Sequence, residues 1–167
     1  MSGELRIDAA AGEVIAPSRW RAMRTFVLVG SMAVIAGGLV AAVTGPASLA
    51  DGSWAAAYLV LVAGVGQVAL GVGQAVLAAV VPSGRRRGWE LLLYNVANTA
   101  VLLGTVIDTV PLVMAGGVIL LVALLLFLSG VRRTHAHRWQ LVGYRMLLSL
   151  LAASIPVGLV LAVLRHG

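Results

Sequence analysis

The sequence has no cysteine and no lysine, and it is poor in charged and aromatic residues. Without cysteine, the chain cannot form disulfides, thiolate metal sites or iron–sulfur clusters. Charged residues make up 11% of the 167 residues, whereas a soluble domain carries about 25%. Hydrophobic residues account for 60% of the chain. This composition excludes a soluble globular enzyme, a disordered protein and a nucleic-acid-binding module.

The basic residues are all arginine, and they outnumber the acidic residues 12 to 6, so the formal net charge is +6. A strongly basic chain often binds nucleic acid. In so apolar a chain, however, arginines that face anionic lipid headgroups explain the charge better. We therefore expect the partner to be a lipid bilayer with anionic headgroups, and not nucleic acid.

Long apolar segments alternate with turn-like segments rich in glycine, proline and serine. An apolar helix of about 20 residues crosses a hydrocarbon core of about 30 Å. The segments that meet this length are residues 25–43, 55–81, 89–107, 112–131 and 142–164. They predict an all-α polytopic integral membrane bundle of about five transmembrane helices, the membrane domain being residues 25–164.

The arginines are distributed unevenly between the two ends of the predicted spans. Every arginine except Arg165 lies before the first span, in alternate loops, or near the start of the fifth span, where Arg145 lies. The intervening loops carry Asp51 and Asp108 instead. By the positive-inside rule, the N-terminus is cytoplasmic and the C-terminus is outside. Residues 1–24 then form a cytoplasmic tail and residues 165–167 a short outer tail. The arginine-rich, lysine-free composition is typical of GC-rich bacteria, so we expect a multi-pass protein of the bacterial inner membrane.

One alternative concerns the first span. Ser48-Leu49-Ala50 resembles the small-residue site at which a signal peptide is cleaved. The apolar run of residues 25–43 is longer than a typical signal core of about 7–15 residues. The sequence favours a retained span but leaves cleavage open.

Small and polar residues line one face of the second predicted span. Helices in lipid associate through close packing of small residues and through interhelical hydrogen bonds. This face should therefore pack against another helix, and a similar stripe on the first span includes Gly37. The predicted helix-packing residues are Gly37, Gly64, Gln67, Gly71 and Ala75. The fourth span consists mainly of large aliphatic residues and is expected to be the most exposed to lipid.

A polar layer is predicted in the cytoplasmic third of the bundle. Gln74, Asn95 and Asn98 are expected about 9–14 Å below the inner interface, at matching depth on two antiparallel spans. They form either an interhelical amide hydrogen bond or a polar cavity for a solute or a lipid headgroup. Arg145 either reaches lipid phosphates or faces inward, where Glu90 is a candidate partner. The candidate binding residues are Gln74, Asn95, Asn98, Arg145 and Glu90.

The sequence offers no convergent set of catalytic groups, and it predicts no catalytic residue, cofactor or metal site. The His135-x-His137 pair has no evident third ligand. We therefore expect a non-enzymatic accessory or structural subunit, in a larger membrane complex or a homo-oligomer. The alternative is a small-solute or lipid-handling permease that uses the polar layer, and a membrane enzyme ranks third.

Overall fold

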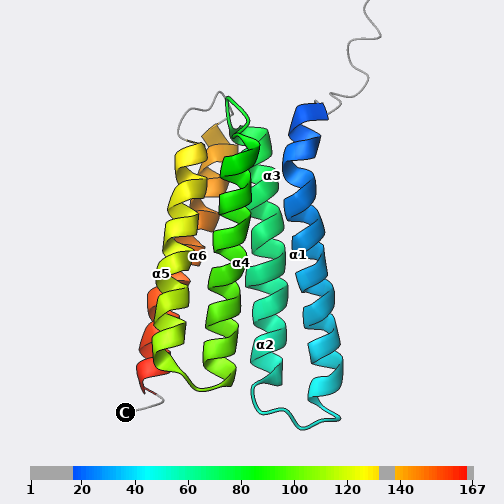
Figure 1. Ribbon diagram of the computed structural model, residues 1–167, viewed down its shortest axis with the longest axis vertical. Coiled ribbons are helices and arrows are strands. Elements are labelled where there is room, and N and C mark those ends of the chain that lie inside the picture. The colour runs from blue at the N-terminus through cyan, green and yellow to red at the C-terminus, as the bar shows by residue number, and fades with distance from the viewer. Residues whose placement is uncertain (1–16, 132–137, 165–167) are drawn as a thin grey trace, which may run out of the picture.

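The computed structural model describes residues 17–131 and 138–164, with side chains for 17–131 and 139–154 (Figure 1). The described residues form helices α1 (Pro17–Thr44), α2 (Gly52–Tyr58), η2 (Leu59–Gly66), α3 (Gln67–Leu77), α4 (Gly84–Val106), α5 (Val110–Gly130) and α6 (Arg138–Leu164). Helices α2, η2 and α3 follow one another without a break, and we call them the second rod. The structure is thus a bundle of five helical rods, which confirms the predicted all-α class.

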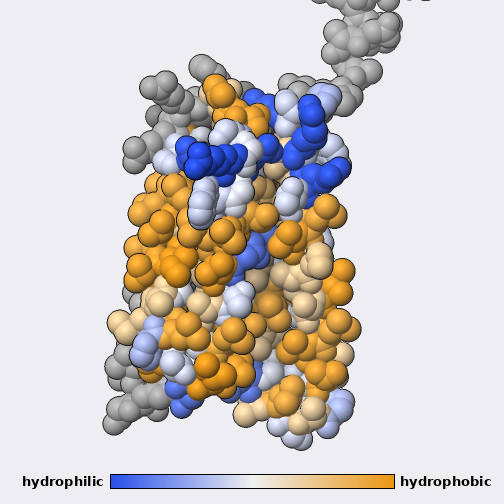
Figure 2. All heavy atoms as spheres, in the orientation of Figure 1, coloured by the Kyte–Doolittle hydropathy of each residue, from blue (hydrophilic) through white to orange (hydrophobic). Residues whose placement is uncertain are grey.

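Three of the rods are long and apolar enough to cross a membrane: α1, the second rod and α5. Helices α1 and α4 begin at the same end of the bundle, which we call the arginine end, and α6 ends at the opposite end (Figure 1). Hydrophilic residues gather at the arginine end, and hydrophobic residues cover much of the middle of the bundle (Figure 2).

Several helix ends differ from the predicted spans. Helix α1 begins at Pro17 rather than at residue 25. Proline is favourable at this position, because the backbone N–H groups of a first helical turn have no partner in the helix and proline has no N–H. The second rod ends at Leu77 rather than at residue 81. There, the guanidinium of Arg19 donates hydrogen bonds to the carbonyl oxygens of Ala75 (2.5 Å) and Val76 (3.0 Å). A cation at these carbonyls stabilises the helix terminus.

Helix α4 begins at Gly84 rather than at residue 89, because Ser83 caps it. The Ser83 hydroxyl accepts a hydrogen bond from the backbone N–H of Arg86 at 3.4 Å, the contact expected of a serine at this position. Arg85, Arg86 and Arg87, expected in a loop, therefore lie in the first turn of α4. Of the predicted tail 1–24, residues 17–24 belong to α1. The loop with His135 and His137, and the predicted outer tail 165–167, lie outside the described residues.

Glycines bring the rods into two close pairs. In the first pair, a Cβ added to Gly37 of α1 would lie 2.9 Å from the backbone oxygen of Ala56 in α2. In the second pair, a Cβ at Gly116 of α5 would lie 2.8 Å from the backbone nitrogen of Val101 in α4. Only a residue without a side chain allows backbones to approach so closely. The bundle therefore contains an α1–second rod pair and an α4–α5 pair.

Larger side chains fill the space between the two pairs, and α6 completes this core. The ring of Phe127 in α5 makes edge contacts with Phe26 at 5.6 Å and with Tyr94 at 6.3 Å between centroids. Helix α6 contributes Tyr144 and Leu148 to the same cluster. The buried polar residues of the described chain come from the second rod and α4, and are Gln67, Gln74, Glu90 and Asn98. Gln74 and Glu90, and likewise Tyr58 and Asn98, form hydrogen bonds between the two pairs.

The prediction that the fourth span is the most exposed is wrong. In the most apolar window of α5, 39% of residues are buried inside the protein, against 17% in that of α1. The reason is position in the bundle: α5 contacts both α4 and α6, whereas α1 contacts mainly the second rod. Large aliphatic residues on α5 fill the core between these neighbours.

Candidate functional site: a buried glutamate held by three rods

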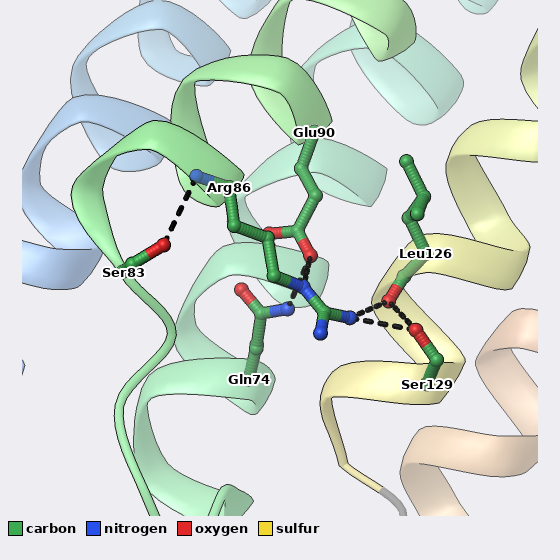
Figure 3. Close-up of polar contacts among 6 residues, drawn as sticks. All are labelled: Gln74, Ser83, Arg86, Glu90, Leu126 and Ser129. Atoms are coloured by element: carbon green, nitrogen blue, oxygen red, sulfur yellow. Dashed lines mark hydrogen bonds and ion pairs between the residues drawn. The ribbon is translucent and has the colours of Figure 1, made fainter.

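The carboxylate of Glu90 is the centre of a polar cluster at the arginine end (Figure 3). The Glu90 side chain is fully buried, and its Oε1 lies 2.9 Å from Nε of Arg86, one turn earlier in α4. The same Oε1 accepts a hydrogen bond of 3.0 Å from the side-chain amide of Gln74 in α3. A buried carboxylate needs such partners, because its desolvation costs several kcal/mol, roughly, when no charge compensates it.

Arg86 extends this cluster to a third rod. Its Nη2 donates to the carbonyl oxygen of Leu126 and to the hydroxyl of Ser129, each at 2.6 Å (Figure 3). Gly130 leaves room for the cluster, since a Cβ there would lie 2.6 Å from Nε2 of Gln74. The cluster of Gln74, Arg86, Glu90 and Ser129, which we call the glutamate clamp, therefore joins α3, α4 and α5.

Tertiary contacts, rather than helix propensity, explain the Arg86–Glu90 pair. In an isolated helix, an arginine four residues before a glutamate is the weaker order, and a cation in the first turn opposes the helix dipole. Here Arg86 gains the carbonyl of Leu126 and the hydroxyl of Ser129. These bonds come from α5 and compensate for the unfavourable local order.

A second polar level lies further along α4. The Tyr58 hydroxyl donates to Oδ1 of Asn98 at 2.9 Å, and Nδ2 of Asn98 donates to the backbone oxygen of Tyr94 at 2.7 Å. The Tyr94 hydroxyl donates in turn to the carbonyl of Val62 in the π-helical segment η2, at 2.6 Å. Asn98 is eight positions from Glu90, or about 12 Å along the helix axis. This level is therefore separate from the glutamate clamp.

The structure brings together only part of the predicted polar layer. Gln74 meets Glu90, but Asn98 meets Tyr58, and the amide of Asn95 donates to Leu91 in its own helix. The predicted common depth is incorrect, because the second rod ends earlier and α4 begins earlier than the sequence indicated. Gln74 is consequently close to the end of its helix, whereas Asn95 and Asn98 lie deep in α4.

Arg145 is not brought to this cluster. Its side chain is exposed on α6, whereas that of the preceding residue, Tyr144, is buried. Successive residues point about 100° apart around a helix, so the helix that turns Tyr144 inward directs Arg145 outward. The inward-facing alternative for Arg145, with Glu90 as its partner, is therefore not observed.

The predicted packing residues lie between α1 and the second rod or in the core beside them. A Cβ at Gly64 would meet the backbone oxygen of Gly30 at 3.0 Å, and Gly71 lies against the ring of Phe26. Ala75 is buried with Ala22 and Met23. Gln67 is also fully buried, and neither atom of its amide has a hydrogen-bond partner among the described residues.

Sequence reasoning missed several members of these clusters. The four-residue spacing of Arg86 and Glu90 could have indicated their ion pair. Ser129, Tyr58 and the carbonyl of Val62 carry no such signal, since their partners lie on other rods. In the described part of the chain, no group of three or more histidine, cysteine or acidic residues is placed to hold a metal ion.

Comparison of the chain with protein-family models, curated proteins and solved structures finds no match. The fold and its surface define the class: a helical protein with three rods that can cross a membrane.

Proposed function

We propose that the chain is a multi-pass protein of the bacterial inner membrane, with the arginine end in the cytoplasm. The first turns of α1 and α4 carry arginines, whereas Asp51 and Asp108 lie at the opposite end. This asymmetry supports the orientation by the positive-inside rule. The polar residues of α4 lower its hydropathy, but α4 and α6 run alongside the three apolar rods (Figure 1). All five rods then cross the bilayer.

Within that membrane, we propose a non-enzymatic accessory or structural subunit of a larger complex. The observation that carries this proposal is a groove of about 550 Å³ between α1 and α2, near the opposite end. Exposed small residues line part of it, including Gly38, Ala41, Gly45 and Ala57. Lipid chains gain nothing from small residues, whereas a helix packs closely on them. The groove therefore suits a helix of a partner subunit.

The hydrogen bonds among the buried polar residues support the same proposal. Oε1 of Glu90 is bound by Arg86 and Gln74, and Asn98 is bound by Tyr58, whereas the buried Oε2 of Glu90 has no hydrogen-bond partner among the described residues. Side chains that bind one another in this way stabilise the bundle rather than offer a free binding layer.

Purification from native membranes in a mild detergent tests this function. We expect a larger membrane protein to copurify in fixed stoichiometry with the wild-type chain. Gly38→Leu should release that partner, because the leucine fills the groove, while Gly143→Leu on α6 should retain it. A Cβ at either glycine meets no atom within 4 Å, so both variants should fold. A chain that purifies alone or only with itself, or that keeps the partner in both variants, contradicts the proposal.

A small-solute or lipid-handling permease is the second candidate, and the buried amide of Gln67 favours it. An amide in the membrane interior requires hydrogen-bond partners, and those of Gln67 are not supplied by the described residues. Mass spectrometry of the purified protein should then detect a polar solute in fixed stoichiometry, which Gln67→Leu removes. Asn95→Ala is the matched control, since Asn95 bonds only within its own helix. A wild-type protein without such a solute contradicts the permease.

A further inference from the structure

A cavity of about 440 Å³ at the arginine end lies between α4 and α5 and is separate from the groove described above. Its lining residues are Ser83, Arg85, Arg86, Trp89, Leu93 and Leu126. Arg86, Trp89 and Leu93, and likewise Arg85 and Trp89, are spaced three or four residues apart, so these members share one side of the helix. Arginine and serine lie toward the helix start, and tryptophan and leucine further along. The cavity is open to the surface and mainly apolar, and the end with the arginines and Ser83, which we call the cationic part, forms only a small share of its lining.

The cationic part has a net positive charge. Arg86 and Glu90 form an ion pair, and the Glu90 carboxylate is fully buried, so this pair contributes little net charge to the surface. Arg85 is exposed beside it, and the first turn of α4 contains no acidic residue. The Ser83 hydroxyl accepts from the N–H of Arg86 and retains its own hydrogen for donation. A cation and a hydroxyl donor are the groups that bind a phosphate diester.

The apolar part continues onto the outer surface of the bundle. Trp89 is 52% exposed, and the neighbouring Leu92 and Leu125 are 51% and 55% exposed. In the proposed orientation this surface faces acyl chains, and tryptophan prefers the headgroup level of a bilayer. The cavity is therefore open to a chain that enters from the lipid.

We propose that this cavity binds one anionic phospholipid from the cytoplasmic leaflet. Its phosphate contacts Arg85 and Ser83, and one acyl chain lies over Trp89, Leu93 and Leu126. Charge and shape together select this occupant, because a free phosphate would leave the apolar part empty and the headgroup cation of a zwitterionic phospholipid would be repelled by the arginines. The bonds from Arg86 to Leu126 and Ser129 hold α4 against α5, so the cavity is preformed. The proposal rests on the membrane orientation above but not on the subunit role.

Lipid titration of the detergent-purified, delipidated chain tests this site, with native mass spectrometry as the measurement. We expect one phosphatidylglycerol per chain to bind at least about tenfold more tightly than phosphatidylcholine with the same acyl chains, since the choline cation of phosphatidylcholine is repelled by the arginines. Arg85→Gln should weaken phosphatidylglycerol binding by about tenfold, while Arg85→Lys should largely retain it. Arg24→Gln, which removes an exposed arginine of α1 at the same end, should leave binding unchanged.

Glycerol phosphate, a headgroup without acyl chains, distinguishes the two sources of phosphate. It should bind much more weakly than phosphatidylglycerol. The proposal would be overturned if glycerol phosphate bound as tightly as phosphatidylglycerol, or if phosphatidylcholine did. It would also be overturned if Arg85→Gln and Arg24→Gln weakened phosphatidylglycerol binding equally. None of these results affects copurification of a protein partner through the opposite groove, so the two proposals can fail independently.

Discussion

Glu90 and Arg86 form an ion pair of 2.9 Å in which the glutamate side chain is fully buried and that of the arginine is 36% exposed. This pair is a contact within one helix, yet its remaining bonds reach α3 and α5. The glutamate clamp is therefore a junction between rods.

Removal of one partner of the clamp should destabilise the bundle strongly. We expect Arg86→Met to lower the free energy of unfolding by about 3 kcal/mol, because it leaves the buried Glu90 carboxylate without its cation. Arg86→Met combined with Glu90→Leu should recover most of that loss, since replacing a whole buried pair by apolar groups is often neutral. Unfolding in detergent measures all three proteins. A double variant as unstable as the single one would show that the clamp is not a coupled unit.

The two neighbouring glycines of α1 should differ in their tolerance of a side chain. Gly37→Ala should lower the free energy of unfolding by about 1–3 kcal/mol through overpacking, because its Cβ would press on the backbone of α2. Gly38→Ala should have almost no effect, since its Cβ meets open space. Thermal unfolding of the purified variants makes the comparison. Equal stability would mean that α1 does not pack on the second rod through Gly37.

The Tyr94 hydroxyl should stabilise the π-helical segment. Tyr94→Phe removes the hydrogen bond to the Val62 carbonyl and should cost about 0.6 kcal/mol, the average for interhelical bonds in a membrane protein, and at most about 1.7 kcal/mol. Gly66→Ala should disturb the same contact, because its Cβ would lie 2.8 Å from the Tyr94 hydroxyl oxygen. The losses in the double variant should then be less than additive. Strict additivity would contradict a shared contact.

Arg19 should protect the end of the second rod from opening. Arg19→Gln removes the donor to the carbonyls of Ala75 and Val76, so amide hydrogen exchange near the end of α3 should become faster. Arg21→Gln is the control, because Arg21 bonds to the Pro17 carbonyl of its own helix. Unchanged exchange in Arg19→Gln, or equal changes in both variants, would exclude this capping role.

The proposed orientation predicts which end is accessible from outside the cell. The chain has no cysteine, so a single introduced cysteine can be labelled without background. A membrane-impermeant thiol reagent should label Gly45→Cys in intact spheroplasts and should label Gly88→Cys only after lysis. Both glycines are exposed, with open space around the Cβ position. Labelling in the reverse order would invert the orientation.

The sequence predicted the helical class well and the helix ends less well. Apolar runs locate the interior of each rod directly, because the length of a bilayer crossing and the helical rise determine how many residues are needed. Helix ends depend on individual contacts instead. The cap by Ser83 is a local signal that was available, whereas the contact of Arg19 with Ala75 joins residues far apart in the sequence.

The candidate site was predicted only in part for the same reason. Glu90 was selected as a candidate partner of Arg145 and Gln74 as a polar residue of an apolar segment, and the structure joins Gln74 to Glu90. Asn95 and Asn98 were selected on the same grounds but have other partners. A small error in the helix ends changes the relative depth of residues on antiparallel helices, because each residue adds about 1.5 Å.

The long apolar runs and the scarcity of charge predicted, from the sequence alone, an apolar helical protein, and the positions of the arginines indicated that most of them lie on one side. Run length and charge placement are sufficient for that conclusion, because transfer of side chains from water to lipid depends on residue type and a bilayer crossing needs about 20 residues. Only the tertiary structure decided that α1 is more exposed than α5 and that Glu90 joins three rods. Burial and pairing depend on which faces of different helices meet, and glycines such as Gly37 and Gly116 determine those contacts through backbone approach.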